Sequence, residues 1–216
     1  MKPKLILCLA LVLSGICPAA IIYPKVPDGG RQIIMEYATE TLRSDPRFLG
    51  GFHIAELIIA APYENYYVGV TNLASGKFLS AIKSNGYWTY LFMHGTNAVG
   101  DAGLMADEKT GKAMKANGLG SSDFSKETLA AIRIAEQLPQ IKKQDYEIRR
   151  LDIPSILFVA VWLHGKSDDI IIPLPPTFGR WNDYQPYSES EMIKLLKPEA
   201  KKKLEEISKE PPGAVD

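Results

Sequence analysis

The chain has 216 residues, of which 25 are Lys or Arg and 25 are Asp or Glu, so its formal net charge at pH 7 is zero. With 46% hydrophobic and 23% charged residues, the composition is that of a folded chain and not of a disordered one. The balanced charge argues against nucleic-acid binding through phosphates, because such binding needs a clustered excess of Lys and Arg. Two cysteines are too few for a disulfide scaffold or a Cys-rich metal cluster.

Residues 1–20 have the layout of a secretory signal peptide. Two lysines precede an unbroken apolar run over residues 5–13, and Cys17 and Ala19 supply small residues at positions −3 and −1 of a cleavage site. The apolar run is too short to span a bilayer. An ordinary buried N-terminal helix is the alternative interpretation.

Cleavage near Ala19 or Ala20 would remove both cysteines and two lysines, and would leave a thiol-free chain with a small acidic excess. No later stretch reaches the roughly 18 apolar residues of a membrane-spanning helix. The sequence therefore predicts an exported protein, periplasmic or extracellular, with no membrane span in the mature chain. No motif indicates a cofactor or a resident metal.

Three helices are predicted after this segment. Apolar residues recur at helical spacing over residues 31–44, 125–138 and 188–208. At the start of the third helix, Ser188 and Glu191 have the spacing of a capping box, in which each side chain bonds the backbone of the other residue.

The region between the first two helices has the short apolar stretches and turn residues of an antiparallel meander of four or five strands. Asn85-Gly86 is the strongest hairpin signal, and residues 94–97 form another turn. The polar, Gly-rich residues 106–123 are predicted to be a long surface loop. The strands of the meander are expected over residues 53–61, 66–72, 77–83, 87–92 and 98–105.

A second block of three strands is expected over residues 146–153, 155–163 and 169–174. Because strands occur in blocks and do not alternate with helices, the order of elements predicts an α+β fold with a largely antiparallel sheet. One domain is expected over residues 31–208, preceded by a Pro- and Gly-containing linker at 21–30 and followed by a frayed tail at 209–216.

The three histidines are the candidates for chemistry, and the first of them, His53, begins a predicted strand. His94 and His164 each end a predicted strand before a Gly turn, and Asp168 and Asp169 follow the second of them closely. If the two strand blocks share one sheet, these side chains could form a zinc site or an acid–base pair of a hydrolase. No short-range ligand spacing supports this, and the alternative is that they are exposed turn residues. No complete catalytic motif is present elsewhere.

Aromatic residues gather in two places, the meander and the loop that follows the Pro-Leu-Pro-Pro segment. We expect Trp88 and Tyr90 of the meander and Trp181 and Tyr184 of the loop to line a binding surface, with Arg180 as a polar contact. The alternatives are core packing and a subunit interface. The preferred hypothesis is an exported binding domain for a small molecule, a peptide or an envelope protein; the alternative is the histidine-based enzyme.

The stretch LDIPSILFVAVWLHGKSDDIIIPLPP, with the later YSESEMIKLLKP, resembles the C-terminal part of a group of uncharacterised bacterial proteins. The shared pattern is a strand, an apolar strand ending in Trp-Leu-His-Gly, an acidic turn, a Pro segment and a capped helix. The resemblance covers residues 146–198 and implies paired strands there. It brings no activity, substrate or catalytic residue.

Overall fold

The computed structural model of the chain describes residues 20–120 and 122–209. The predicted signal peptide lies outside the described residues except for Ala20, and so does all but the first residue of the predicted tail. The helices are α1 (Gly30–Ser44), α2 (Val70–Ala74), α3 (Ser122–Glu136) and α4 (Glu189–Ile207). The strands are β1 (Ile21–Ile22), β2 (Ile58–Tyr67), β3 (Lys83–His94), β4 (Asn97–Ala106), β5 (Ala113–Gly120), β6 (Tyr146–Ile153), β7 (Phe158–Gly165), β8 (Asp169–Pro173) and β9 (Tyr187–Ser188).

All of these strands belong to one mixed sheet in the order β5-β4-β3-β2-β6-β7-β8-β9, with β1 added beside β6. Strands β2 to β5 form an antiparallel meander, and β6 to β8 form a second antiparallel block. The two blocks are joined where β2 pairs in parallel with β6. The predicted α+β fold with a largely antiparallel sheet is confirmed, including the division into a four-strand meander and a three-strand block.

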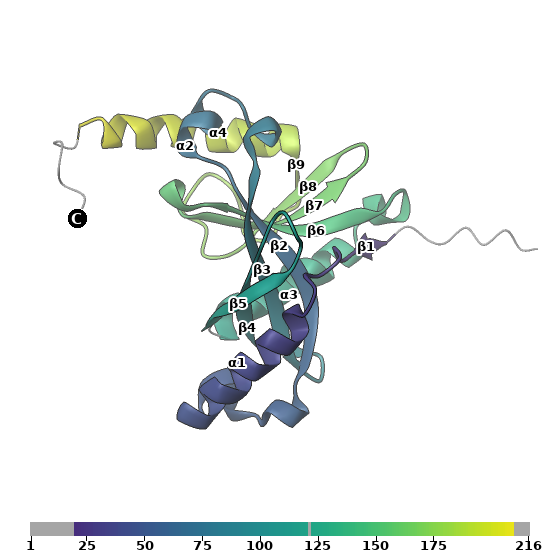
Figure 1. Cartoon of the computed structure of the whole chain (residues 1–216). Coiled ribbons are helices and arrows are strands. Elements are labelled where there is room, and N and C mark those ends of the chain that lie inside the picture. The colour runs from purple at the N-terminus through teal and green to yellow at the C-terminus, as the bar shows by residue number, and fades with distance from the viewer. Residues whose placement is uncertain (1–19, 121, 210–216) are drawn as a thin grey trace, which may run out of the picture.

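The helices cover different parts of this sheet (Figure 1). Helix α1 packs on β4 and β5 at one end of the molecule, and α2 and α4 pack together at the other end. Helix α3 packs on β4, β7 and β8. No helix among the described residues is long and apolar enough to span a membrane.

Different helices bury the two faces of the β6–β7 pair: α2 and α4 pack on one face, and α3 packs on the other. Side chains alternate along a strand, so Leu151 and Ile153 of β6 and Trp162 of β7 lie in one core cluster, together with residues of α2 and α4. Ile148 of β6 and Val161 of β7 lie in a second cluster, together with residues of α3. We call the face of Leu151, Ile153 and Trp162 the closed face. The face of Ile148 and Val161 is called the cleft face, because a cleft opens on it.

The three predicted helices and the second strand block are confirmed to within a few residues. The capping box of α4 is also present, with the Glu191 carboxylate accepting from the Ser188 N–H at 2.9 Å. The side-chain and backbone bonds from Ser188 hold the pKa of the Glu191 carboxyl below its ordinary value.

The predicted boundaries in the meander are wrong in several places. Residues 54–56 form a 3-10 turn before β2, and residues 70–74 form α2, where strands were expected. Asn85-Gly86 makes no hairpin but lies inside β3. Trp88 pairs with Glu64 and Ser84 with Tyr66, so the extra residues of β3 form a bulge. Gly86 has a φ of 69°, so the bulge uses the same left-handed conformation that a hairpin turn needs.

Two segments that were expected to be irregular contain strands. Within residues 106–123, β5 forms the sheet edge beside β4, although its sequence AMKANGLG lacks β-branched residues. Within the predicted linker at 21–30, β1 pairs with β6, and the Asp28 carbonyl accepts from the Ala113 N–H at 3.1 Å. The predicted turn after His94 is confirmed.

Candidate functional site

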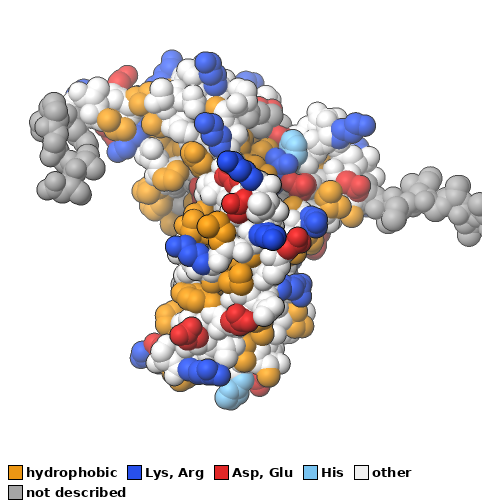
Figure 2. Space-filling model, viewed as in Figure 1, with side chains coloured by type: hydrophobic (Ala, Val, Ile, Leu, Met, Phe, Trp, Pro, Cys, Tyr) orange, Lys and Arg blue, Asp and Glu red, His pale blue; other side chains and the backbone are white. Residues whose placement is uncertain are grey.

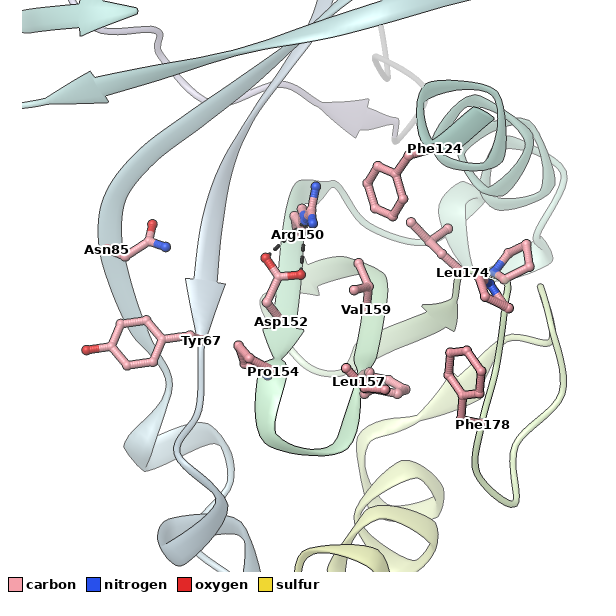
Figure 3. Close-up of a pocket in the computed structure, with 13 residues that line it drawn as sticks. Tyr67, Asn85, Phe124, Arg150, Asp152, Pro154, Leu157, Val159, Leu174 and Phe178 are labelled. Carbon is pink, nitrogen blue, oxygen red and sulfur yellow. Dashed lines mark hydrogen bonds and ion pairs between the residues drawn. The ribbon is translucent and has the colours of Figure 1, made fainter. Parts of the chain in front are cut away.

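A cleft of about 800 Å³ opens on the cleft face of β6 and β7 (Figure 3). It lies at the N-terminal end of α3, beyond which this helix no longer covers the sheet. Tyr67 and Asn85 stand on one side, at the ends of β2 and β3. Phe124 of α3, Leu174 and Phe178 stand on the other side. Its volume is within the range of small-molecule sites in proteins.

An ion pair forms the floor of this cleft. Arg150 and Asp152 are two residues apart on β6 and so project from the same face. The Arg150 Nε donates to both carboxylate oxygens of Asp152, at 3.1 and 3.0 Å. The two side chains are 22% and 21% exposed, so the pair is largely desolvated but open to the cleft. The Arg150 guanidinium also lies 4.3 Å from the centre of the Phe124 ring.

Burial shifts the protonation of this floor. Burial raises the pKa of the Asp152 carboxyl above its ordinary value, and the Arg150 charge offsets only part of this effect. The same is true of Asp101 on β4, whose carboxylate accepts from the Ser125 hydroxyl at 2.7 Å. Gly120 leaves room for this arrangement, since a Cβ there would overlap the Asp101 carboxylate. The Arg150 charge therefore acts on two carboxylates, those of Asp152 and Asp101.

Two large apolar side chains at the rim are exposed. Leu157 is 65% exposed and Phe178 is 67% exposed, and both border the cleft. Leu157 also has a φ of 52°, a left-handed conformation that costs free energy for a residue with a branched side chain. Exposed apolar residues that gather around a hollow are typical of interaction sites.

The structure places the five predicted aromatic-surface residues elsewhere. Trp88 and Tyr90 are buried in a third core cluster with residues of α1, and burial raises the pKa of Tyr90 to about 12. Trp181 is 4% exposed, and its ring packs edge-on against Phe158 with ring centres 5.0 Å apart. These three side chains act in core packing and do not line the cleft.

The other two predicted residues belong to the loop that carries Trp181. Arg180 is exposed and forms an ion pair with Glu199 of α4 at 3.4 Å. Tyr184 is partly buried against the cleft-face core, and its N–H donates to the Pro173 carbonyl at 2.9 Å. Neither residue lines the cleft, so the predicted single aromatic surface does not form.

The predicted histidine site does not assemble either. Strands β3 and β7 are three steps apart in the sheet, which separates them by roughly 14 Å at the usual strand spacing. His94 stacks on Phe52, with ring centres 4.0 Å apart. Asp168 accepts from the Tyr146 hydroxyl at 2.7 Å. No group of three His, Cys, Asp or Glu side chains in the described part of the chain is arranged to hold a metal ion.

One pair from this prediction does form. The Nδ1 of His164 lies 2.9 Å from a carboxylate oxygen of Asp169, which is buried while the imidazole is 42% exposed. His164 pairs with Glu147, three residues before Arg150 on β6. Alternation therefore puts the His164–Asp169 pair on the closed face, where it cannot contact a ligand in the cleft.

Sequence reasoning missed three of the residues that define the cleft, Arg150, Asp152 and Leu157, whereas Phe178 belongs to the aromatic loop that was expected to border a pocket. A weak signal for the first two was present, because they are oppositely charged residues at a spacing of two in a predicted strand, although Glu147 and Arg149 of the same strand have that spacing too. The open end of α3 is a tertiary feature that no local pattern reports.

Comparisons of the chain with models of protein families, with curated proteins and with solved structures gave no match. The resemblance of residues 146–198 to a group of uncharacterised bacterial proteins therefore stays a prediction. The charges on the face in Figure 2 are of both signs and interspersed, in keeping with the balanced composition.

Proposed function

We propose that this chain is an exported binding domain and that its cleft holds a small organic molecule with an apolar body. The observation that carries the proposal is the cleft of about 800 Å³ with exposed Leu157 and Phe178 at its rim and the Arg150–Asp152 pair at its floor. Binding would bury the two exposed side chains, and apolar burial is the main favourable term in such association.

The floor favours a ligand with a polar group that both donates and accepts hydrogen bonds. In the part of the chain that the structure describes, the Arg150 guanidinium donates hydrogen bonds to other protein groups only through its Nε. Its two terminal nitrogens therefore have donors left for a ligand. Asp152 supplies acceptors beside them. A simple anion would be repelled by Asp152 and Asp101, whereas a carboxamide satisfies both partners without adding charge.

A fluorescent probe tests the proposal. N-phenyl-1-naphthylamine is neutral, apolar and carries one N–H, and its fluorescence rises in an apolar site. Phe178→Ala should weaken its binding about tenfold, since a buried Phe side chain contributes about 1.5–3 kcal/mol. Met114→Ala is the matched control, because Met114 is 59% exposed on β5. Equal affinity for the wild-type chain and the Phe178 variant would contradict the proposal.

Competition tests the polar group. Decanamide should displace the probe at a lower concentration than decanoate does, because the carboxylates of Asp152, at the floor, and of Asp101, outside the cleft lining, repel an added negative charge. In Asp152→Asn, which removes one of these charges, the preference should shrink. A preference for decanoate in the wild-type chain would show that the floor recognises anions.

Export is tested separately, because the signal peptide is proposed from sequence alone. The full chain expressed in a bacterial host should be recovered outside the cytoplasm. A variant with a charge in the apolar run, Leu9→Arg, should remain inside the cell. Recovery of both chains in the cytoplasm would contradict export. It would not bear on binding, which the fluorescent probe tests separately.

A second candidate function is acid–base catalysis by His164, favoured by its 2.9 Å contact with buried Asp169. Such a carboxylate fixes the tautomer and orientation of an imidazole that acts as a general base. The test is hydrolysis of p-nitrophenyl esters: His164→Asn should abolish any turnover, and His94→Asn should leave it unchanged. Equal rates in both variants would exclude His164 as the base.

A further inference from the structure

Ala20 is the first residue that the structure describes, and two hydrogen bonds connect it to the domain. Its N–H donates to the Oδ1 of Asp145 at 3.0 Å, and its carbonyl accepts from the Tyr146 N–H at 3.0 Å. The two residues that follow form β1, which pairs with the start of β6. Ile21 packs against the cleft-face core. Residue 20 is thus hydrogen-bonded to the start of β6, and its nitrogen lies beside a carboxylate.

We propose that the signal segment is cleaved between Ala19 and Ala20, and that the new α-ammonium of Ala20 forms an ion pair with Asp145. This inference rests on the proposed export. The sequence leaves two cleavage positions open, after Ala19 or after Ala20, and the structure distinguishes them. Cleavage after Ala20 would remove the residue that makes both hydrogen bonds. Cleavage after Ala19 keeps both and places small residues, Cys17 and Ala19, at positions −3 and −1.

The cleavage is a hydrolysis by a signal peptidase and consumes one water. The carbonyl carbon of Ala19 gains the hydroxyl group and leaves with the signal segment as a carboxylate. The nitrogen of Ala20 keeps the electron pair of the broken bond and takes up protons to become an ammonium. The neutral N–H that donates to Asp145 is thereby replaced by a charged donor, which forms a shorter and stronger hydrogen bond to a carboxylate.

The ion pair stabilises the mature chain only modestly, because Ala20 and Asp145 are both exposed. Its importance is positional, because it holds the first residue of the mature chain against the start of β6, the strand that carries Arg150 and Asp152.

The first experiment is the mass of the N-terminal peptide of the full chain after expression in an exporting bacterial host. The proposal expects a chain that begins at Ala20. A chain that begins at Ile21 or at any other residue would overturn it while leaving export intact. An uncleaved chain would overturn the proposed signal peptide as well, so the two failures are distinguishable.

The second experiment is a double-mutant cycle on the thermal midpoint of the mature chain, with a free or an acetylated N-terminus. Asp145→Asn should lower Tm by about 1–3 °C in the free-amine chain, the size expected of an exposed ion pair in a domain of this length. In the acetylated chain, which lacks the charge, the decrease should be less than half as large. The matched control is Asp183→Asn, an exposed carboxylate on the loop before β9, which should show no such difference. Equal decreases for Asp145→Asn in both chains would overturn the ion pair.

Discussion

The two faces of β6 and β7 differ in how completely helices cover them. On the closed face, Leu151 and Ile153 are fully buried with residues of α2 and α4. On the cleft face, α3 covers Ile148 but begins at Ser122, and Arg150 and Asp152 of the same strand remain at the floor of an open hollow. One strand thus contributes core on one side and a candidate binding site on the other, and the open hollow lies where α3 no longer covers the sheet.

The largest expected effect is on the closed face. Leu151→Ala should lower the free energy of unfolding by about 2–5 kcal/mol, because it leaves a cavity in a fully buried cluster. The measurement is urea unfolding followed by circular dichroism. A loss below 1 kcal/mol would mean that this face is not the tightly packed core described above.

Breaking the ion pair at the floor should have an intermediate effect. Arg150→Met leaves the largely buried Asp152 carboxylate without its positively charged partner, which we expect to cost about 1–3 kcal/mol after allowance for the remaining exposure. The same unfolding assay checks it, with Arg43→Met as a control for loss of an exposed arginine. An unchanged stability would indicate that solvent already screens the pair.

A smaller effect should appear in the pH dependence of stability. Burial raises the pKa of the Asp101 carboxyl above its ordinary value of 3.8. The folded chain therefore binds this proton more tightly than the unfolded chain does. The contribution of Asp101 is fully present below pH 3.8 and is lost as the pH rises through the folded-state pKa.

In this pH window the wild-type chain should lose stability relative to Asp101→Asn as the pH is raised. Urea midpoints at several pH values above 3.8 check this prediction. Parallel curves for the two chains would show that the Ser125 hydrogen bond and the Arg150 charge cancel the effect of burial.

The smallest expected effect on stability is at the rim. Leu157→Gly removes an exposed side chain and places Gly at a φ of 52°, so the free energy of unfolding should change by less than about 1 kcal/mol. Binding of N-phenyl-1-naphthylamine should nevertheless weaken several-fold. A stable variant that binds the probe as tightly as the wild-type chain would show that Leu157 does not contribute to binding.

The sequence predicts the helices and the second strand block better than the meander. Periodic apolar residues located α3, α4 and strands β6 to β8, because these elements bury one continuous stripe each. The β3 bulge at Asn85-Gly86 and the edge strand β5 were missed, since the same turn residue serves a hairpin or a bulge and an edge strand needs little β propensity.

The candidate site was predictable only in part. Trp181 was expected to line a binding surface together with the other aromatics of its loop, but its ring packs against Phe158, while Phe178, three residues earlier, remains exposed. The spacing of Arg150 and Asp152 in a predicted strand implies a shared face, but nothing in the sequence marks that face as open. Whether that face is open depends on where α3 begins relative to β6, which is fixed by contacts between segments far apart in the chain.

The central claim is that ligands bind to the cleft face and not to the closed face. Two-dimensional amide NMR of the mature chain with and without N-phenyl-1-naphthylamine tests it most directly. The account predicts that shift changes concentrate at Phe124, Asp152, Leu157 and Phe178, while Trp162 and His164 on the other side of the same strands are unaffected. Changes centred on Trp162 and His164 would contradict it.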